Sequence, residues 1–260
     1  MEHTVDQVGP FAYRDVGTGA PVLFLHGLGG SSVAWEPQLE ALAGDHRCIA
    51  WDMPGYGGSE PIEPLTFHAL ADAAARLLDS LDVERVDVVG LSFGGQQALH
   101  LALRHPARVR RLVLADTSAS FGADGTDVDE WIARRLLPLD QGRSIVDVAD
   151  QVIDAVSAPG FAGRERDRTL QAFGRIPVSG FRAAVRCLPT HDVRSRLGHV
   201  TAPTLVIVGE LDRETPVEYA RTLATGIPNA DLAIIPGVGH LTPAEAPDEF
   251  NALVARFLAG

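Results

Sequence analysis

The sequence predicts an α/β fold, with a mostly parallel, doubly wound sheet and a helical lid inserted between two strands. Short apolar runs alternate with longer stretches of helical period, as in parallel strands joined by crossover helices. The runs are compact and apolar, which is typical of strands buried on both faces of a parallel sheet. The alternation covers residues 1 to about 117 and resumes near residue 200, and the interval contains helical patches and no convincing strand.

Seven strands and three crossover helices follow from this pattern. The apolar residues between Ala69 and Leu81 recur at i, i+1, i+4 and i+5, which gives a helix one wide apolar face. A second helix follows Ser92 and ends near His105-Pro106, and a third runs from about Pro243 to Leu258. The expected strands are Phe11–Val16, Val22–Leu25, Cys48–Trp51, Val86–Val89, Arg111–Ala115, Leu205–Val208 and Leu232–Ile235.

The interval without strands is expected to form the lid. Ser144 and Asp147 have the spacing of a capping box, which opens a helix. We expect a core domain of residues 1–117 and 196–260 and a helical lid (cap) of residues 118–195 over the carboxyl edge of the sheet. The expected lid helices are Asp129–Leu137, stopped by Pro138; Ser144 to Pro159-Gly160; and Arg164–Gly174.

Composition narrows the possible partners and chemistries. The chain has 260 residues, of which 46% are apolar and 22% charged, enough for one large globular domain. Its formal charge of -12 opposes binding to nucleic acid. All 22 basic residues are Arg, so mechanisms built on a Lys amine are excluded, including pyridoxal phosphate enzymes and phosphate-binding P-loops.

Neither a metal site nor a membrane anchor is indicated. Cys48 and Cys187 stand alone, without a CxxC motif or a His cluster, so each is expected to be a small buried hydrophobe. The N-terminal segment lacks the features of a targeting sequence, and no apolar run approaches the ~18 residues of a membrane span. These patterns predict a soluble, cytoplasmic protein without a metal, a cofactor or a membrane partner; a homo-oligomer is left open.

The strongest chemical signal is Gly90–Gly95, with the sequence GLSFGG. It directly follows the expected strand Val86–Val89 and opens a helical pattern, which is the context that a G-x-S-x-G nucleophile turn requires. The turn is so sharp that larger side chains two positions either side of Ser92 would collide with backbone. Ser92 is therefore the candidate nucleophile, and a glycine-rich structural turn is the alternative.

A serine nucleophile needs a base, and the base needs an anionic partner. His240 follows the last expected strand and is the candidate base. Asp212 follows the strand Leu205–Val208 and is the candidate acid. Asp116, which follows the strand after the nucleophile helix, and Glu210, which could be a surface or capping acid, are the rivals of Asp212.

Two backbone N–H groups are expected to stabilise the oxyanion of a tetrahedral intermediate. One is that of Phe93, at the N-terminus of the helix after Ser92, where the helix dipole also helps. The other is assigned to Leu28 in the glycine-rich loop HGLGG. We expect His26 to hold this loop by hydrogen bonds, and Asp52 to be a structural acceptor.

Five segments in order, HGLGG, DMPGYGGS, GLSFGG, GELD and GVGH, resemble the α/β-hydrolase superfamily along nearly the whole chain. The run GELDRETP, the segment GVGHL, Asp116–Ser118, and Trp131 with Arg134 resemble the 3-oxoadipate enol-lactonase branch. This resemblance implies an α/β-hydrolase fold and a cofactor-independent hydrolase of a small carboxylate-bearing lactone or ester, with a role in aromatic catabolism and a lid that closes over the substrate.

Cationic and aromatic lid residues are candidates for substrate binding. Arg134 could pair with a substrate carboxylate, and so could other lid arginines, whereas solvated helix faces are the alternative explanation. Trp131 is a candidate pocket wall or part of the lid core. The other lid cations considered are Arg135, Arg143 and Arg182.

These residues predict a serine hydrolase that cleaves a small carboxylic ester or lactone through an acyl-enzyme. Ser at position 92 argues against dehalogenases and epoxide hydrolases of this fold, whose nucleophile is a carboxylate. Three alternatives stay open: a carbon-carbon bond hydrolase of vinylogous diketones of the meta-cleavage product type, a perhydrolase, and a non-catalytic ligand receptor on the same scaffold.

Overall fold

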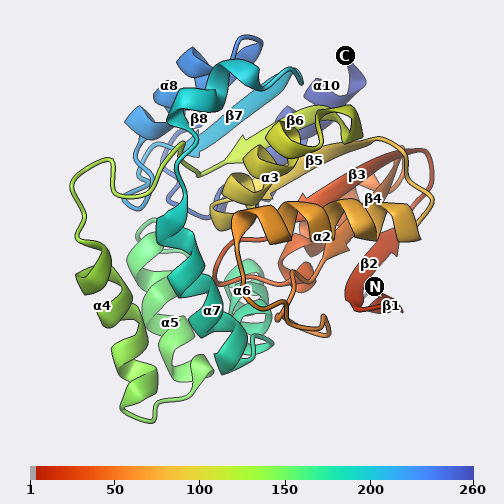
Figure 1. Cartoon of the computed structure of the whole chain (residues 1–260). Helices are drawn as coiled ribbons and strands as arrows, with labels where there is room; N and C mark the ends of the chain where they lie inside the picture. Colours follow the sequence, from red (N-terminus) through yellow and green to blue (C-terminus); the bar gives the residue numbers. More distant parts are fainter. Residues whose placement is uncertain (1–3) are drawn as a thin grey trace.

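A computed structural model describes residues 4–260, and residues 1–3 of the N-terminal segment considered above lie outside it. One eight-stranded sheet runs through the molecule in the order β1-β2-β4-β3-β5-β6-β7-β8 (Figure 1). The pairs β1-β2 and β2-β4 are antiparallel, and all other neighbours are parallel. The strands are β1 Asp6–Val8, β2 Phe11–Val16, β3 Ala20–Leu25, β4 His46–Trp51, β5 Val86–Leu91, β6 Val109–Ala115, β7 Thr204–Gly209 and β8 Ala230–Ile235.

Helices cover both faces of the sheet. Helices α2, α3 and α8 pack on one face, and α10 packs on the other (Figure 1). Helix α1 contributes to the same apolar layer as α10. The core helices are α1 Glu36–Leu42, α2 Phe67–Ser80, α3 Phe93–Arg104, α8 Val217–Gly226, α9 Thr242–Glu245 and α10 Pro247–Ala259, with short 3₁₀ helices at Ser32–Trp35, Pro106–Arg108, Leu188–Thr190 and Arg194–His199. The doubly wound fold class and seven of the strands are confirmed.

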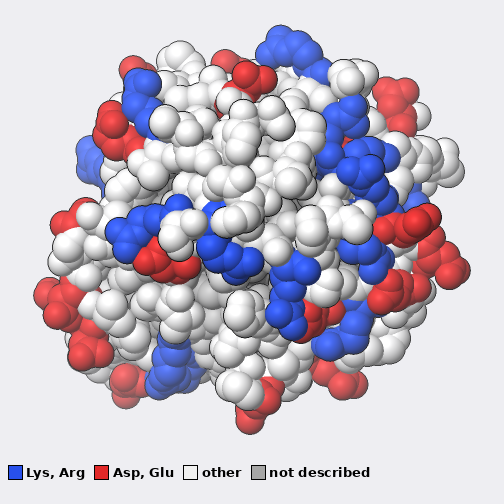
Figure 2. Space-filling model, turned by 45° about the horizontal axis from the view of Figure 1, so that its top comes forward, with Lys and Arg blue, Asp and Glu red and all other residues white. Residues whose placement is uncertain are grey.

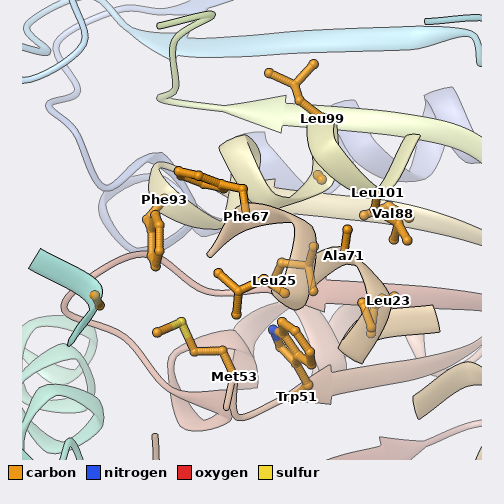
Figure 3. Close-up of a cluster of buried hydrophobic side chains, with 14 of the residues drawn as sticks. Leu23, Leu25, Trp51, Met53, Phe67, Ala71, Val88, Phe93, Leu99 and Leu101 are labelled. Carbon is orange, nitrogen blue, oxygen red and sulfur yellow. The ribbon is translucent and has the colours of Figure 1, made fainter. Parts of the chain in front are cut away.

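The two-residue period of the strands explains the two apolar layers. Leu23 and Leu25 face the α2–α3 side, whereas Val22 and Phe24 face the α1–α10 side. Figure 3 shows the first of these layers, where strand side chains meet residues of α2 and α3. Because the sheet is buried on both faces, its central strands need no polar alternation. The side chains in this view include Leu23, Leu25, Trp51, Val88, Phe67, Ala71, Leu99 and Leu101.

Four α-helices lie between β6 and β7, where three were predicted. They are α4 Val128–Asp140, α5 Ile145–Val156, α6 Arg164–Gly174 and α7 Val178–Cys187, and we call residues 118–195, which contain them, the insertion. The capping box at the start of α5 is confirmed, with Ser144 Oγ accepting from Asp147 N–H at 3.2 Å.

Two helix boundaries predicted at or beside prolines are wrong. Helix α4 passes through Pro138, because the bond that proline removes lies near the end of the helix and would go to Arg134, which is exposed. The C-terminal helix predicted from Pro243 is two helices, α9 and α10. They are separated at Ala246, whose φ of -136° and ψ of 62° are not helical. Ala246 precedes Pro247, and a residue before proline avoids the α region.

Both cysteines are buried and unpaired, as predicted. Burial raises the pKa of Cys48 and that of Cys187 to about 12. Within residues 4–260, every helix is too short or too polar to cross a membrane.

A pair of histidines joins the ends of the insertion to α3. His191 donates its Nε2–H to the carbonyl oxygen of Ser118 at 2.9 Å, so its Nδ1 accepts from His100 Nε2–H at 3.1 Å. A β-bridge between Ser120 and Asp192 joins the same two segments. The two ends of the insertion are therefore fixed to each other and to the core.

This histidine pair predicts acid sensitivity of the fold. Burial lowers the pKa of His191 to about 4, and burial together with the charge of His191 lowers that of His100 to about 3. The unfolded chain therefore binds more protons below about pH 6.5, and the free energy of unfolding should fall as the pH drops from about 6.5 to about 4.

His191→Gln keeps a donor and an acceptor but cannot take up this proton. The free energy of unfolding of this variant should fall less steeply than that of the wild type over the same range. The two slopes should differ by up to about 1.4 kcal/mol per pH unit. Urea denaturation of both proteins at a series of pH values measures the slopes, and equal slopes would contradict the assignment.

Candidate active site

Ser92 stands at the turn between β5 and α3, in a backbone conformation that non-glycine residues rarely adopt. Its φ is 54° and its ψ is -117°. A Cβ on Gly90 would lie 2.7 Å from Gly95 N, and a Cβ on Gly94 would lie 2.7 Å from His26 O, so side chains at either position would collide with backbone. The turn thus has the geometry expected of a strand-to-helix nucleophile turn.

The structure brings Ser92, His240 and Asp212 into one hydrogen-bonded chain. His240 Nε2 lies 2.9 Å from Ser92 Oγ, and His240 Nδ1 lies 2.8 Å from Asp212 Oδ2. Because a carboxylate only accepts, Nδ1 carries a proton, and in the neutral imidazole Nε2 is left to accept from the serine hydroxyl. The loops after β5, β7 and β8 supply the three residues, since the carboxyl ends of parallel strands meet at one edge of the sheet.

The carboxylate of Asp212 is fixed by its own loop. Its Oδ1 accepts from the N–H groups of Glu214 and Thr215 at 2.8 and 2.9 Å, and its Oδ2 accepts from Thr215 Oγ1 at 2.8 Å. These bonds stabilise the ionised form and hold Oδ2 toward His240. Thr215 was not identified from the sequence, where only its place three residues after Asp212 could have indicated an Asx turn.

Electrostatics favour a charged imidazole beside Asp212. Burial alone would lower the pKa of His240, but the charge and hydrogen bond of Asp212 outweigh it and raise that pKa to about 9. Burial opposes ionisation of Asp212, yet the charge of His240 and the hydrogen bonds lower the pKa of this carboxyl overall. The site therefore stabilises the imidazolium that forms when His240 takes a proton from a nucleophile.

The two rival acids occupy other positions. Asp116 is buried, and its Oδ1 accepts from Gly209 N–H at 3.0 Å and its Oδ2 from Thr242 Oγ1 at 2.7 Å. Burial and the charge of Asp212 raise the pKa of Asp116 well above its usual range. Glu210 accepts from Gly237 N–H at 2.9 Å. Asp212 is thus the acid that contacts His240.

His26 and Tyr56 fix the glycine-rich loop. His26 donates its Nδ1–H to Gly27 O at 2.8 Å and accepts from Met53 N–H at Nε2, at 3.1 Å. Tyr56 Oη donates to Leu28 O at 3.0 Å. In a trans peptide the Gly27 carbonyl and the Leu28 N–H point in opposite directions. Because the Gly27 carbonyl points toward His26 Nδ1, the Leu28 N–H points away from His26.

The other expected donor begins a helix. Phe93 is the first residue of α3, so its N–H has no partner within the helix. This N–H lies at the N-terminal end of α3, which is the positive end of the helix dipole. The Gly27–Ser92 contact brings the two loops together, since a Cβ on Gly27 would lie 3.4 Å from Ser92 Cβ. The loops of Leu28 and Phe93 therefore meet at the serine.

Trp131 lies within the insertion and is buried. Its ring packs edge-on against Phe121, with 5.0 Å between centroids, and Arg135 Cζ lies 3.8 Å from the Trp131 ring centroid. Arg135 also donates to Glu214 Oε2 at 2.8 Å. Glu214 belongs to the loop of Asp212, so this ion pair joins α4 to the acid loop.

The remaining arginines named for the lid are held at the surface of the insertion. Arg134 is exposed, Arg182 pairs with Asp140 at 2.5 Å, and Arg143 donates to Asp147 O at 2.7 Å. Basic and acidic side chains are intermingled on the face seen in Figure 2, where arginines alternate with carboxylates.

Phe173 of α6 packs on the glycine-rich loop. The sequence did not identify it as a candidate site residue, because nothing in this helix distinguished it from other core residues. A Cβ on Gly29 would lie 2.6 Å from its ring, so the aromatic side chain rests directly on the loop next to Leu28. It is buried and packs with Phe181, at 5.8 Å between ring centroids. The insertion thus presents an aromatic side chain to the loop of the expected oxyanion donor.

The fold and the arrangement of the site define a class of protein. A model of the alpha/beta hydrolase fold family matches residues 20–247, so the chain belongs to that family and is a hydrolase of this fold. It is 35% identical over 269 residues to a 2-hydroxymuconate semialdehyde hydrolase of a Pseudomonas species, covering 95% of this chain and 89% of that protein. It is 32% identical over 247 residues to RutD of a Caulobacter species, a proposed carbamate hydrolase, covering 92% of this chain and 90% of that protein.

Solved structures agree with this assignment. The crystal structure of the enol-lactonase from Burkholderia xenovorans LB400 has a TM-score of 0.88 to this chain, with 26% identity, and covers 99% of this chain and 100% of that one. The resemblance to the α/β-hydrolase superfamily, with enol-lactonases among the relatives, is confirmed.

The electrostatics of the site yield a prediction. Asp212→Asn should lower the pKa of His240 from about 9, because burial then acts on the imidazole without the charge of the adjacent carboxylate. An NMR titration of protein with isotope-labelled histidine side chains measures this pKa. Glu210→Gln, which contacts Gly237 and not His240, is the matched control and should leave it in place. An unchanged pKa in Asp212→Asn would contradict the assignment.

Proposed function

We propose that the protein is a serine hydrolase that cleaves a carboxylic ester or lactone of a small molecule through an acyl-enzyme. The observation that carries the proposal is the hydrogen-bonded chain from Ser92 Oγ through His240 to Asp212. In the first half, His240 Nε2 takes the hydroxyl proton while Ser92 Oγ bonds to the carbonyl carbon. The ester C–O bond then breaks, and the leaving oxygen receives that proton from His240.

In the second half, water replaces the serine hydroxyl. His240 takes a proton from water as the hydroxide oxygen bonds to the acyl carbon, and the proton returns to Ser92 Oγ as the acid leaves. Asp212 stabilises the imidazolium in both halves, and the N–H groups of Phe93 and Leu28 would hold the oxyanion. Removing one such donor in comparable enzymes lowers turnover by roughly 100- to 1000-fold.

The surroundings of the site favour a small, uncharged acyl group. Phe173 rests on the loop beside Leu28 and supplies an apolar surface. Arg135 is held by Glu214, and Arg182 by Asp140, so these guanidinium groups already have carboxylate partners. We assign the insertion, with residues 118–195 as its bounds, the role of a lid over this acyl site. Trp131 contributes to the lid core. Arg134 is exposed and would bind a substrate carboxylate only in the enol-lactonase-like alternative.

Two relatives supply the alternative reactions. An enol-lactonase-like activity would act on a carboxylate-bearing lactone, as the resemblance of the motifs implies. A carbon-carbon bond hydrolase of the meta-cleavage product type is supported by the 35% identity to 2-hydroxymuconate semialdehyde hydrolase. Both use the same three residues, and the substrate distinguishes them.

Loss of the nucleophile is the direct test of the reaction class. Ser92→Ala should lower hydrolysis of a short-chain p-nitrophenyl ester by about 10⁶-fold, because no other group replaces the attacking oxygen. The variant should also lose covalent labelling by a fluorophosphonate. Ser118→Ala, at a buried serine outside the hydrogen-bonded chain, is the control. Unchanged turnover in Ser92→Ala would contradict the proposal.

A matched substrate series tests the acyl preference. A neutral lactone should have a higher kcat/KM than the same lactone carrying a carboxymethyl group, because paired arginines leave the carboxylate without a partner. Acid release measured at constant pH gives both values. A preference for the carboxylated lactone that Arg134→Gln abolishes would support the enol-lactonase-like alternative, and turnover of a vinylogous diketone alone would support the carbon-carbon hydrolase.

A further inference from the structure

The backbone N–H groups of Gly239, His240 and Leu241 all donate hydrogen bonds. The carboxylate of Glu245 accepts two of these three bonds. Gly239 N–H donates to Glu245 Oε2 at 3.0 Å, and Leu241 N–H donates to Glu245 Oε1 at 2.9 Å. The N–H of His240 itself donates to Val156 O at 3.0 Å. The position of the imidazole is therefore set by a side chain and by a carbonyl at the end of α5.

The same carboxylate also contacts the insertion. Glu245 Oε2 accepts from Ala158 N–H at 2.7 Å, so one oxygen holds a donor from the His240 loop and a donor from the segment after α5. The two segments approach closely, because a Cβ on Gly239 would lie 2.5 Å from Ala158 N and 2.7 Å from Ser157 C. Glu245 thus bridges the histidine loop and the insertion.

We infer that Glu245 is a positioning residue that holds His240 within reach of Ser92 and ties that geometry to the insertion. The inference rests on the proposed role of His240 as the base. Glu245 does not contact the reacting atoms, and it acts through the backbone on either side of His240. In the sequence, Glu245 stands near the start of the C-terminal helical pattern and cannot be distinguished from an ordinary surface acid.

The chemistry of the bridge explains why a carboxylate is required. An ionised carboxylate offers two acceptor oxygens, and hydrogen bonds to it are about twice as strong as neutral ones. A glutamine has one acceptor oxygen, and its NH₂ would face at least one of the three N–H donors. Because the Ser92–His240 bond spans 2.9 Å, a displacement of this loop by about 1 Å removes it and can cost about 100-fold in rate.

The experiment compares Glu245→Gln with Glu210→Gln. Both variants remove one carboxylate that accepts from the loop before His240, since Glu210 contacts Gly237 N–H, but only Glu245 reaches the insertion. Two readouts are taken on the full chain. One is the kcat and KM for a p-nitrophenyl ester. The other, which needs no activity, is the NMR signal of the His240 Nδ1 proton with amide exchange at Gly239, Leu241 and Ala158.

Glu245→Gln should lower kcat by about 10- to 100-fold, leave KM within about twofold, and expose the three amides to exchange. Its His240 Nδ1 proton signal should broaden, whereas Glu210→Gln should resemble the wild type in every readout. Ala158→Pro, which removes the donor from the insertion and keeps the Glu245 carboxylate, should weaken the same NMR signal and serves if Glu245→Gln does not fold. Unchanged kcat, signal and exchange in these variants would overturn the inference. Altered NMR readouts without ester turnover in the wild type would overturn the proposed function and leave the positioning role standing.

Discussion

The hydrogen bond between His240 Nδ1 and Asp212 Oδ2 is the interaction on which the rest of the site depends. It joins the loop after β8 to the loop after β7, and it decides which imidazole nitrogen faces Ser92. The bond is buried, so water screens it little and each group stabilises the charge of the other. Thr215 fixes the acid and Glu245 holds the histidine loop, and both contacts serve this geometry.

The insertion contacts both the loop of Asp212 and the loop of His240. Arg135 of α4 pairs with Glu214 on the acid loop, and Val156 of α5 accepts from the N–H of His240. The insertion therefore contributes to the geometry of the hydrogen-bonded Ser92–His240–Asp212 residues. A movement that displaced α4 and α5 together would disturb the acid and the histidine at once. A movement confined to α6 and α7 would leave both contacts in place.

Much of the fold and the central site residues could be predicted, because their signals are local. The buried runs on β3 and β5 and the glycines around Ser92 are each visible in a short stretch of sequence. Other features depend on distant contacts. Helix α8 begins after Pro216 without an N-cap side chain, and β1 is a three-residue edge strand that pairs only with β2. The partner of Arg135 lies 79 residues away, so its orientation toward Glu214 could not be deduced from its neighbours.

Trapping the acyl-enzyme during turnover tests directly whether Ser92 is the nucleophile. Rapid quenching after mixing with p-nitrophenyl acetate, followed by mass spectrometry of proteolytic peptides, identifies the residue that carries the acetyl group. We expect a burst of one equivalent of p-nitrophenol per chain and an acetyl group on the peptide that contains Ser92. Turnover with the acetyl group on a different residue, or with no covalent intermediate under conditions that slow deacylation, would contradict it.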